Sequence, residues 1–222
     1  MKKSAYKRAL CALFSVFLVL TMVFPGEVAL AASAPGNVAR FSMTGCSAST
    51  VSLSWSKVKG ASGYRIRRYD SKSKKWKTVL TATKGSAIKG TVKKLSPATT
   101  YKLQIHAYKK AGKKTLYSKK AKTLIVATKP AKVTLQSVKA SGAKITVSWK
   151  KGAASGYQVI YARNKQFKNG ESILVGGSNK AATYYAPYSG TYYVHLRPYK
   201  NLNGKKYYGS WSNAKTVKVN IP

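Results

Sequence analysis

Acidic residues are nearly absent from this chain of 222 residues, which contains 3 Asp and Glu against 42 Lys and Arg. Its formal net charge at pH 7 is +39. Such a surface attracts polyanions over a screening length of about 8 Å at physiological salt. Charge can also serve solubility alone, but a net charge of about 2–8 is enough for a small domain. The excess therefore favours contact with an anionic partner.

Histidine and cysteine are scarce as well, with 2 residues of each. Paired-carboxylate hydrolysis needs two acids flanking one bond, and zinc needs closely spaced ligands. Beyond residue 31 the groups suited to such chemistry are scattered along the chain; they are Cys46, Asp70, His106, Glu171 and His195. The sequence also has no Gly-rich phosphate loop between a strand and a helix. We therefore expect no enzyme, no catalytic residue, no metal site and no cofactor.

The N-terminal residues have the pattern of an export signal. Four basic residues precede the apolar run 9–24, and the small residues of 29–31 follow it. This pattern predicts a secretory signal peptide over residues 1–31, whereas a membrane anchor would need about 20 apolar residues. We expect a secreted protein, extracellular or associated with a cell wall, without a membrane span in the mature chain. Because Cys46 would be its only cysteine, packing alone must stabilise the fold.

From Pro35 onward, short apolar–polar alternations are separated by clusters of Gly, Ser, Asn and Lys, which is typical of β-strands. The pattern occurs twice, with an offset of roughly ninety residues, as expected for two copies of one domain. The paired landmarks are Pro35 and Pro130, Trp55 and Trp149, Gly63-Tyr64 and Gly156-Tyr157, and Thr100-Tyr101 and Thr191-Tyr192.

These landmarks resemble the fibronectin type III module, an immunoglobulin-like β-sandwich of seven strands that needs no disulfide. The resemblance implies an all-β fold with two tandem sandwiches, over residues 35–128 and 130–222. It also implies that the two tryptophans are core residues. Tyr101 and Tyr192 would form tyrosine corners, whose hydroxyls bond to the backbone upstream.

Two further patterns, Ala61-Ser-Gly-Tyr64 and the segment 204–212, narrow the resemblance. They are similar to modules in secreted and cell-wall proteins of Gram-positive bacteria. There such modules serve as spacers or accessory binding modules, so the resemblance implies a surface role of this kind. Neither turn contains the Arg-Gly-Asp tripeptide of some adhesive modules, so that recognition is not implied.

Strand alternation also separates the residues of 100–110 into two faces. If Tyr101, Leu103 and Ile105 face the core, then Lys102, Gln104, His106 and Tyr108 face outward. Interleaved cations and tyrosines suit an acidic polymer, because cations neutralise its charge and tyrosines stack on its sugars or bases. For each residue singly, an ordinary solvated sheet face is the alternative. The candidate polyanion- or glycan-binding residues are Arg65, Arg67, Lys102, His106, Tyr108, Lys109, Lys110, Lys113, Lys114, Tyr193, His195, Arg197, Tyr199, Lys205 and Lys206.

Taken together, these patterns predict a secreted, non-enzymatic binding or adhesion protein. Its partner would be an anionic polymer or acidic glycan of the cell surface. A carbohydrate-binding module that uses exposed tyrosines, and a structural spacer that contacts a protein partner, remain open. Extracellular nucleic acid would share the salt dependence of the first reading but has no support of its own.

Overall fold

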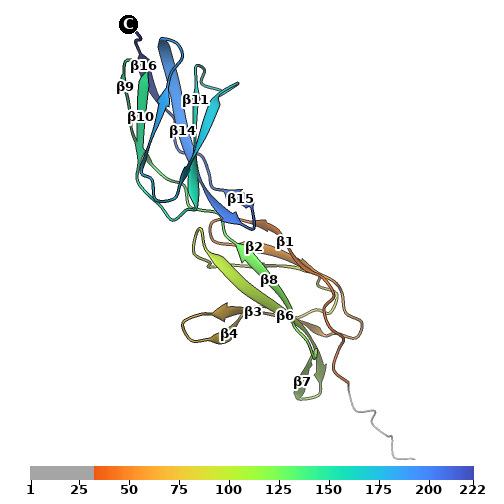
Figure 1. Cartoon of the computed structure of the whole chain (residues 1–222). Coiled ribbons are helices and arrows are strands. Elements are labelled where there is room, and N and C mark those ends of the chain that lie inside the picture. The colour runs from red at the N-terminus through yellow and green to blue at the C-terminus, as the bar shows by residue number, and fades with distance from the viewer. Residues whose placement is uncertain (1–32) are drawn as a thin grey trace, which may run out of the picture. The chain divides into compact units, whose positions relative to one another are not determined.

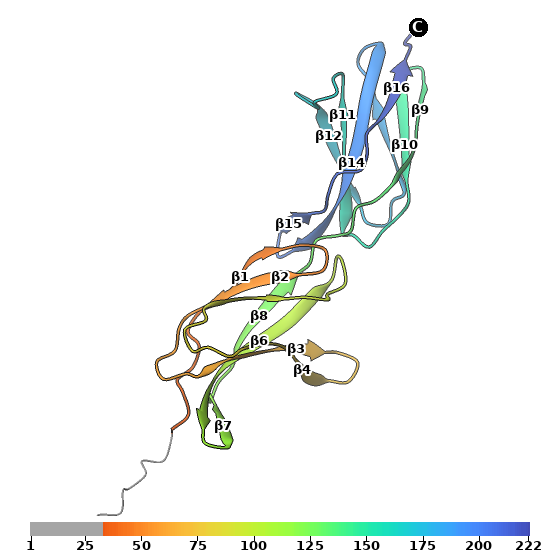
Figure 2. The ribbon, with the colours of Figure 1, turned by 180° about the vertical axis from the view of Figure 1, so that it is seen from behind.

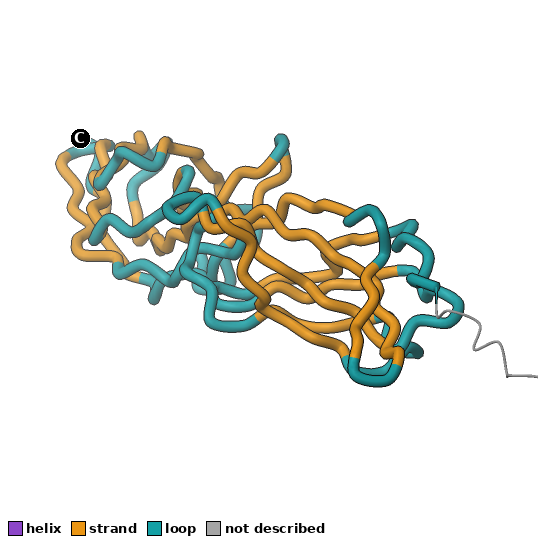
Figure 3. The backbone as a smooth tube through the Cα atoms, turned by 90° about the horizontal axis from the view of Figure 1, so that it is seen from below, coloured by secondary structure: helices purple, strands orange, loops and turns teal. Residues whose placement is uncertain are grey.

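The computed structural model describes residues 33–222, so the expected signal peptide of residues 1–31 lies outside the described residues. The described chain consists of strands, turns and loops (Figure 3). None of its segments forms a helix with the length and apolarity needed to cross a membrane. Its strands form four sheets, which pair into two β-sandwiches. The expected all-β fold with two sandwiches is confirmed.

In the first sandwich a three-stranded sheet packs against a five-stranded sheet (Figure 1). The smaller sheet has the order β1 (Phe41–Cys46), β2 (Val51–Trp55), β5 (Lys89–Val92). The larger has the order β4 (Lys75–Ala82), β3 (Gly63–Asp70), β6 (Thr100–Ala111), β7 (Lys114–Tyr117), with β8 (Lys122–Ala127) also pairing with β6. Because β7 and β8 both pair with β6, they are two parts of one last strand, which gives the expected seven-stranded plan.

The second sandwich repeats this arrangement, and Figure 2 shows it from behind. Its smaller sheet has the order β13 (Ala181–Tyr185), β10 (Lys144–Trp149), β9 (Leu135–Ser141). Its larger sheet has the order β12 (Glu171–Gly176), β11 (Gly156–Ala162), β14 (Gly190–Leu202), β15 (Lys205–Tyr208), with β16 (Lys215–Val219) also pairing with β14. In both larger sheets one edge is a strand with a single neighbour, β4 in the first and β12 in the second.

Each core lies between the two sheets of its own sandwich and centres on a tryptophan–tyrosine pair. Trp55 is 4% exposed and packs on Tyr64 with 5.5 Å between ring centroids. Trp149 is 1% exposed and packs on Tyr157 at 5.1 Å. Burying each of these large side chains contributes about 1.5–3 kcal/mol or more, so the pairs are main anchors of the fold. The core role implied for the two tryptophans is confirmed.

The repeated Ala-Ser-Gly-Tyr motif has a hydrogen-bonding reason. In the first sandwich the N–H of Ser62 donates to the carbonyl of Tyr108 at 2.8 Å, and the Ser62 hydroxyl accepts from the N–H of Lys110 at 3.0 Å. Ser155 makes the same two bonds to Tyr199 and Asn201 in the second. The serine thus extends the strand ladder by one residue, and the hydroxyl substitutes for a backbone acceptor.

Both tyrosine corners form as the resemblance implies. The Tyr101 hydroxyl accepts from the N–H of Ser96 at 2.7 Å, and the Tyr192 hydroxyl donates to the carbonyl of Tyr188 at 3.1 Å. Tyr192 is buried, whereas Tyr101 is half-buried against the rim of its core. These bonds fix the connection that precedes β6 and β14, and through it the start of each central strand.

Candidate functional site

On the outer face of the first larger sheet, the expected cations gather around one ring. The guanidinium of Arg65 on β3 lies 4.9 Å from the centroid of Tyr117 on β7, and that of Arg67 lies 5.8 Å away. The ring of His106 on β6 meets the same tyrosine edge-on at 6.2 Å. Its Nδ1 lies 3.1 Å from the carbonyl oxygen of Ser118. All three predicted residues are half-buried, so this cluster packs the sheet face as well as charging it.

Two residues expected to be exposed on this face are buried, and the prediction for them is wrong. Tyr108 is 3% exposed and Gln104 is 9% exposed. Tyr108 lies opposite Gly63 in the register, and a β-carbon at Gly63 would meet the Tyr108 ring. The tyrosine therefore covers the strand where glycine leaves no side chain, and it is protected from solvent itself. Its ring serves packing and offers no surface to a polymer.

The second sandwich carries a longer stack on the equivalent face. The ring of His195 on β14 lies between Phe167 and Trp211, with centroid distances of 3.6 and 4.0 Å and nearly parallel planes. The guanidinium of Arg197 continues the row, 4.3 Å from the centroid of Trp211 and 3.8 Å from that of Tyr208. Four aromatic rings and a guanidinium thus form one cation–aromatic ladder.

Burial within the ladder lowers the pKa values of His195 and Arg197. Burial, and then the positive charge of Arg197, lower the pKa of His195 to about 4, so the ring is neutral at physiological pH. Its Nε2 is buried and has no hydrogen-bond partner among residues 33–222. Burial also lowers the pKa of Arg197, which stays charged and donates from Nε to Oε1 of Gln158 at 2.8 Å. His195 and Arg197 are therefore fixed parts of a packed face.

Tyr193 and Tyr199, the remaining predicted residues of β14, are half-buried. Tyr199 lies opposite Gly156 and covers it as Tyr108 covers Gly63 in the first sandwich. The ammonium of Lys206 lies 5.7 Å from the centroid of the Tyr199 ring. The glycine–tyrosine pair is thus a repeated packing device, which limits the use of Tyr199 as a free stacking platform.

The freely exposed members of the predicted set are lysines. Most lie on the β6–β7 and β14–β15 hairpins, while Lys102 lies on β6 itself and Lys109 is half-buried; the exposed ones are Lys102, Lys110, Lys113, Lys114, Lys205 and Lys206. Among residues 33–222 one salt bridge forms, between Lys77 and Asp70. Lys77 is exposed and Asp70 is half-buried, and mainly the hydrogen bond from Lys77 lowers the pKa of Asp70 to about 2. The other cations of the described chain therefore have no carboxylate partner.

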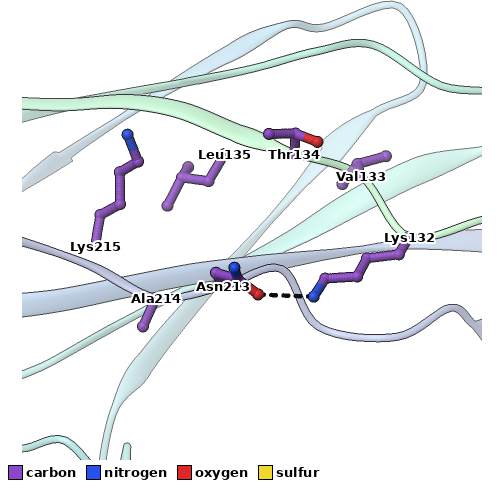
Figure 4. A pocket seen from close by; sticks show the side chains of 7 residues that line it. All are labelled: Lys132, Val133, Thr134, Leu135, Asn213, Ala214 and Lys215. Atoms are coloured by element: carbon purple, nitrogen blue, oxygen red, sulfur yellow. Dashed lines mark hydrogen bonds between the residues drawn. The ribbon is translucent and has the colours of Figure 1, made fainter.

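In a groove on the second sandwich, unlike on the hairpins, two lysine ammonium groups are hydrogen-bonded to the protein. The groove encloses about 610 Å³ between residues 132–135 and 213–215 (Figure 4). The ammonium of Lys132 donates to Oδ1 of Asn213 at 2.8 Å, and that of Lys215 donates to the carbonyl of Gln136 at 2.7 Å. Both amines are directed at the protein's own acceptors, so this groove is a weaker candidate for an anion than the hairpins.

Within residues 33–222 no group of three or more His, Cys, Asp or Glu side chains could hold a metal ion. Cys46 is half-buried, and burial raises the pKa of its thiol, so the sulfur stays protonated at neutral pH. A protonated thiol is a poor nucleophile and a poor metal ligand.

Sequence reasoning missed three members of the two clusters, Tyr117, Phe167 and Trp211. The segment 204–212 contained Trp211, but only residues 205–208 of it pair with β14, so the pairing does not indicate the face of Trp211. Phe167 gave no signal, because it lies in a loop, where its φ is 56°. That backbone conformation is uncommon outside glycine, so no sequence pattern announces it.

Comparisons with known proteins agree with the geometry. The family model for the fibronectin type III domain matches residues 33–123. No curated protein matches the chain. Among solved structures, a segment of two fibronectin type III domains from chicken tenascin is 17% identical with a TM-score of 0.46, covering 85% of this chain and 100% of that one.

Two further solved structures are similar. The chicken CNTN1 FN1–FN3 domains are 18% identical with a TM-score of 0.44, covering 85% of this chain and 69% of that one. The structure of FN3tt is 21% identical with a TM-score of 0.36, covering 44% of this chain and 98% of that one. The second sandwich of the present chain repeats the strand order of the first. Residues 33–123 thus match the family model for the fibronectin type III domain, and a second sandwich with the same strand order follows them.

Proposed function

We propose that the protein is an exported, non-enzymatic binding protein that attaches to an anionic polymer or acidic glycan of the cell surface. Fibronectin type III domains generally serve as binding, adhesion or spacer modules, which supports the broad class. The proposal of an anionic partner rests on the lack of acidic side chains that could neutralise the many lysines and arginines. Residues 33–222 contain a single salt bridge, while the chain as a whole has a formal net charge of +39.

The β6–β7 hairpin is the best local candidate for the contact. Lys110, Lys113 and Lys114 are exposed around the turn at Gly112, whose φ is 56°. The register places Lys114 opposite Ala111, so the hairpin carries the three lysines on one short projection. Lysines spaced along such a projection can neutralise successive charges of a flexible polymer at a small cost in side-chain conformational entropy.

A salt series tests the proposal. The full chain without residues 1–31 is bound to immobilised poly(glycerol phosphate) and eluted at rising salt. Because binding would release counterions, we expect the logarithm of affinity to fall roughly linearly with the logarithm of salt concentration. Binding that does not weaken as salt rises would contradict the proposal.

Charge-matched variants test the hairpin. Lys110, Lys113 and Lys114 are replaced together by Gln, and the control replaces Lys57, Lys59 and Lys84, which are equally exposed on the same sandwich. We expect the hairpin variant to lose several times more affinity than the control. Equal losses would show that charge acts over the whole surface without a preferred site.

The same measurements separate the other readings. A preference for duplex DNA over poly(glycerol phosphate) at matched salt would indicate nucleic acid as the partner. Retention on a neutral polysaccharide at high salt would indicate a carbohydrate-binding module. Recovery of one protein, with no polymer bound at any salt, would indicate a spacer in a protein assembly.

A further inference from the structure

A small cavity in the second sandwich has a chemistry that the basic surface does not explain. It encloses about 310 Å³, near the lower end of the ligand-site range of about 300–1,000 Å³. It lies where β11 ends and β14 begins, and β13 forms one side of it. Its lining includes Tyr161, Arg163, Lys168, Glu171, Tyr184 and Tyr188. A cavity of this size suits one sugar ring better than an extended polymer segment.

Tyr161 gives the cavity an unpartnered polar group. The residue is 2% exposed, and its hydroxyl has no hydrogen-bond partner within residues 33–222. An unsatisfied buried hydroxyl costs about 1–3 kcal/mol, so native proteins rarely keep one without a use. The ring of Tyr184 stacks on Tyr161 at 4.4 Å and is itself half-buried. Both tyrosines line the cavity.

The rim supplies both charge and stacking surface. Tyr188 is 64% exposed, and the guanidinium of Arg163 lies 5.8 Å from the centroid of its ring. Lys168 is held on the rim because Asn164 bonds to its backbone twice, accepting from its N–H at 2.9 Å and donating to its carbonyl at 2.8 Å. Glu171, the one acid of this sandwich, also lines the cavity. Two cations with one carboxylate suit a ligand that carries both an acidic group and hydroxyl donors.

The tyrosine hydroxyls are donors at neutral pH. Burial raises the pKa of Tyr161, and burial with the neighbouring Glu171 carboxylate raises the pKa of Tyr184 to about 12. They can therefore bond to the oxygen atoms of a sugar or a carboxylate.

The first sandwich shows that the fold does not require this arrangement. Its equivalent of Tyr161 in the register is Arg68, which also lines a cavity at the end of its strand. There the guanidinium lies 5.4 Å from the centroid of the Tyr101 ring, so the side chain is engaged. The second copy therefore has a tyrosine-lined cavity with an orphan hydroxyl at a position where the first copy has a closed cation–aromatic contact.

We propose that this cavity binds one acidic sugar unit, a hexuronate, with its ring against the tyrosines and its carboxylate at Arg163 and Lys168. The sugar hydroxyls would donate to Glu171, and a ring or carboxylate oxygen would accept from Tyr161. The inference rests on the proposed function, since a hexuronate is a unit of an acidic glycan. It can nevertheless fail separately, because a monosaccharide does not span the lysine hairpins.

Titration with sodium glucuronate, followed by NMR at constant ionic strength, tests the site. We expect the ring signals of Tyr161, Tyr184 and Tyr188 to shift and to saturate, while sodium acetate and glucose bind more weakly. Tyr161→Phe should weaken glucuronate about fivefold to tenfold, the value of one hydrogen bond to a polar ligand. Tyr185→Phe, a control on the 67% exposed neighbour outside the cavity, should leave the affinity unchanged.

Thermal unfolding without ligand keeps the Tyr161→Phe result interpretable. Since the substitution removes an unsatisfied buried group, the variant should fold with an unchanged or higher Tm. Equal glucuronate affinity in the wild type and a folded Tyr161→Phe variant would overturn the proposal, as would the absence of saturable shifts. Neither result would affect poly(glycerol phosphate) binding, which tests the proposed function.

Discussion

The guanidinium of Arg197 lies 4.3 Å from the centroid of the Trp211 ring, so a cation from the central strand is stacked on an aromatic residue outside the strands. Sequence patterning predicted a surface position for Arg197 and none for Trp211. Their contact shows that much of the face expected to bind a partner is occupied with its own packing. The stability of the second sandwich should therefore depend on this face as well as on the core.

Replacing Arg197 by Lys should destabilise the second sandwich by about 1–2 kcal/mol. Lysine keeps the charge but loses the planar group that stacks between Tyr208 and Trp211 and bonds to Gln158. Urea unfolding measures the loss. Arg67→Lys is the control, because Arg67 lies 5.8 Å from the Tyr117 centroid and should lose less. Equal losses would mean that stacking distance does not matter.

Tyr64→Phe should cost about 1–3 kcal/mol. The Tyr64 hydroxyl is fully buried and accepts from the N–H of Val58 at 2.8 Å, which the substitution would leave unpaired. Tyr157→Phe should behave similarly, because its hydroxyl accepts from the N–H of Gly152 at 3.1 Å. Calorimetry of each variant measures the change. A loss no larger than that of the exposed-site variant Tyr185→Phe would contradict this assignment.

Gly63→Ala should destabilise the first sandwich by about 1–3 kcal/mol through overpacking. A β-carbon there would lie 2.6 Å from the Tyr108 hydroxyl oxygen and would also collide with the carbonyl of Ala82. Gly45→Ala is the matched control, because nothing lies within 4 Å of its added β-carbon. The control should change stability by less than about 0.5 kcal/mol. Chemical denaturation measures the midpoint of each variant. Equal midpoints for Gly63→Ala and Gly45→Ala would contradict the predicted overpacking at Gly63.

His195 should make stability depend on pH in a defined window. Its pKa is about 4 in the folded chain and 6.5 in the reference state, so between these values the unfolded chain binds a proton that the folded chain does not. The contribution of His195 to the free energy of unfolding is therefore fully present above pH 6.5 and is lost as the pH falls towards 4. The loss is on the order of 1–2 kcal/mol once solvent screening is allowed for.

His195→Gln isolates this effect, because Gln104 occupies the equivalent position in the first sandwich. The second sandwich of the variant should unfold at the same urea concentration at pH 6.5 and pH 4.5. Any change in the urea midpoint of the first sandwich between these pH values is subtracted. The pKa of Asp70 is lowered from 3.8 to about 2, so its titration changes stability only below about pH 3.8, outside this window. An undiminished pH dependence in the variant would place its origin elsewhere.

The sequence predicted the two-sandwich fold because the landmark residues act locally and recur. Trp55 and Trp149 end strands with strict alternation, and the corner tyrosines lie near the start of the two central strands. The same alternation was misleading for Tyr108. Period two assigns a side chain to a face, but it does not reveal that the opposite residue is Gly63 and that the tyrosine covers it.

The candidate site was predictable in composition and less so in geometry. Exposed lysines such as Lys113 lie at turns, where sequence alone places them outside. The half-buried cations Arg65 and Arg197 depend on aromatic partners from other parts of the chain, which one strand's pattern cannot specify. The cavity beside Tyr161 was not foreseen, because an inward-facing tyrosine looks like a core residue until its hydroxyl is found without a partner.

The edge strands of the two larger sheets differ in a way that affects handling of the protein. β4 begins Lys-Trp-Lys, and charged side chains on an edge discourage pairing with another chain. β12, with the sequence Glu-Ser-Ile-Leu-Val-Gly, has no lysine and leaves Leu174 51% exposed. Repulsion between highly charged molecules is then the main protection of that edge, and added salt weakens it. The ionic strength that releases the protein from a polymer is thus also the condition under which self-association through β12 should begin.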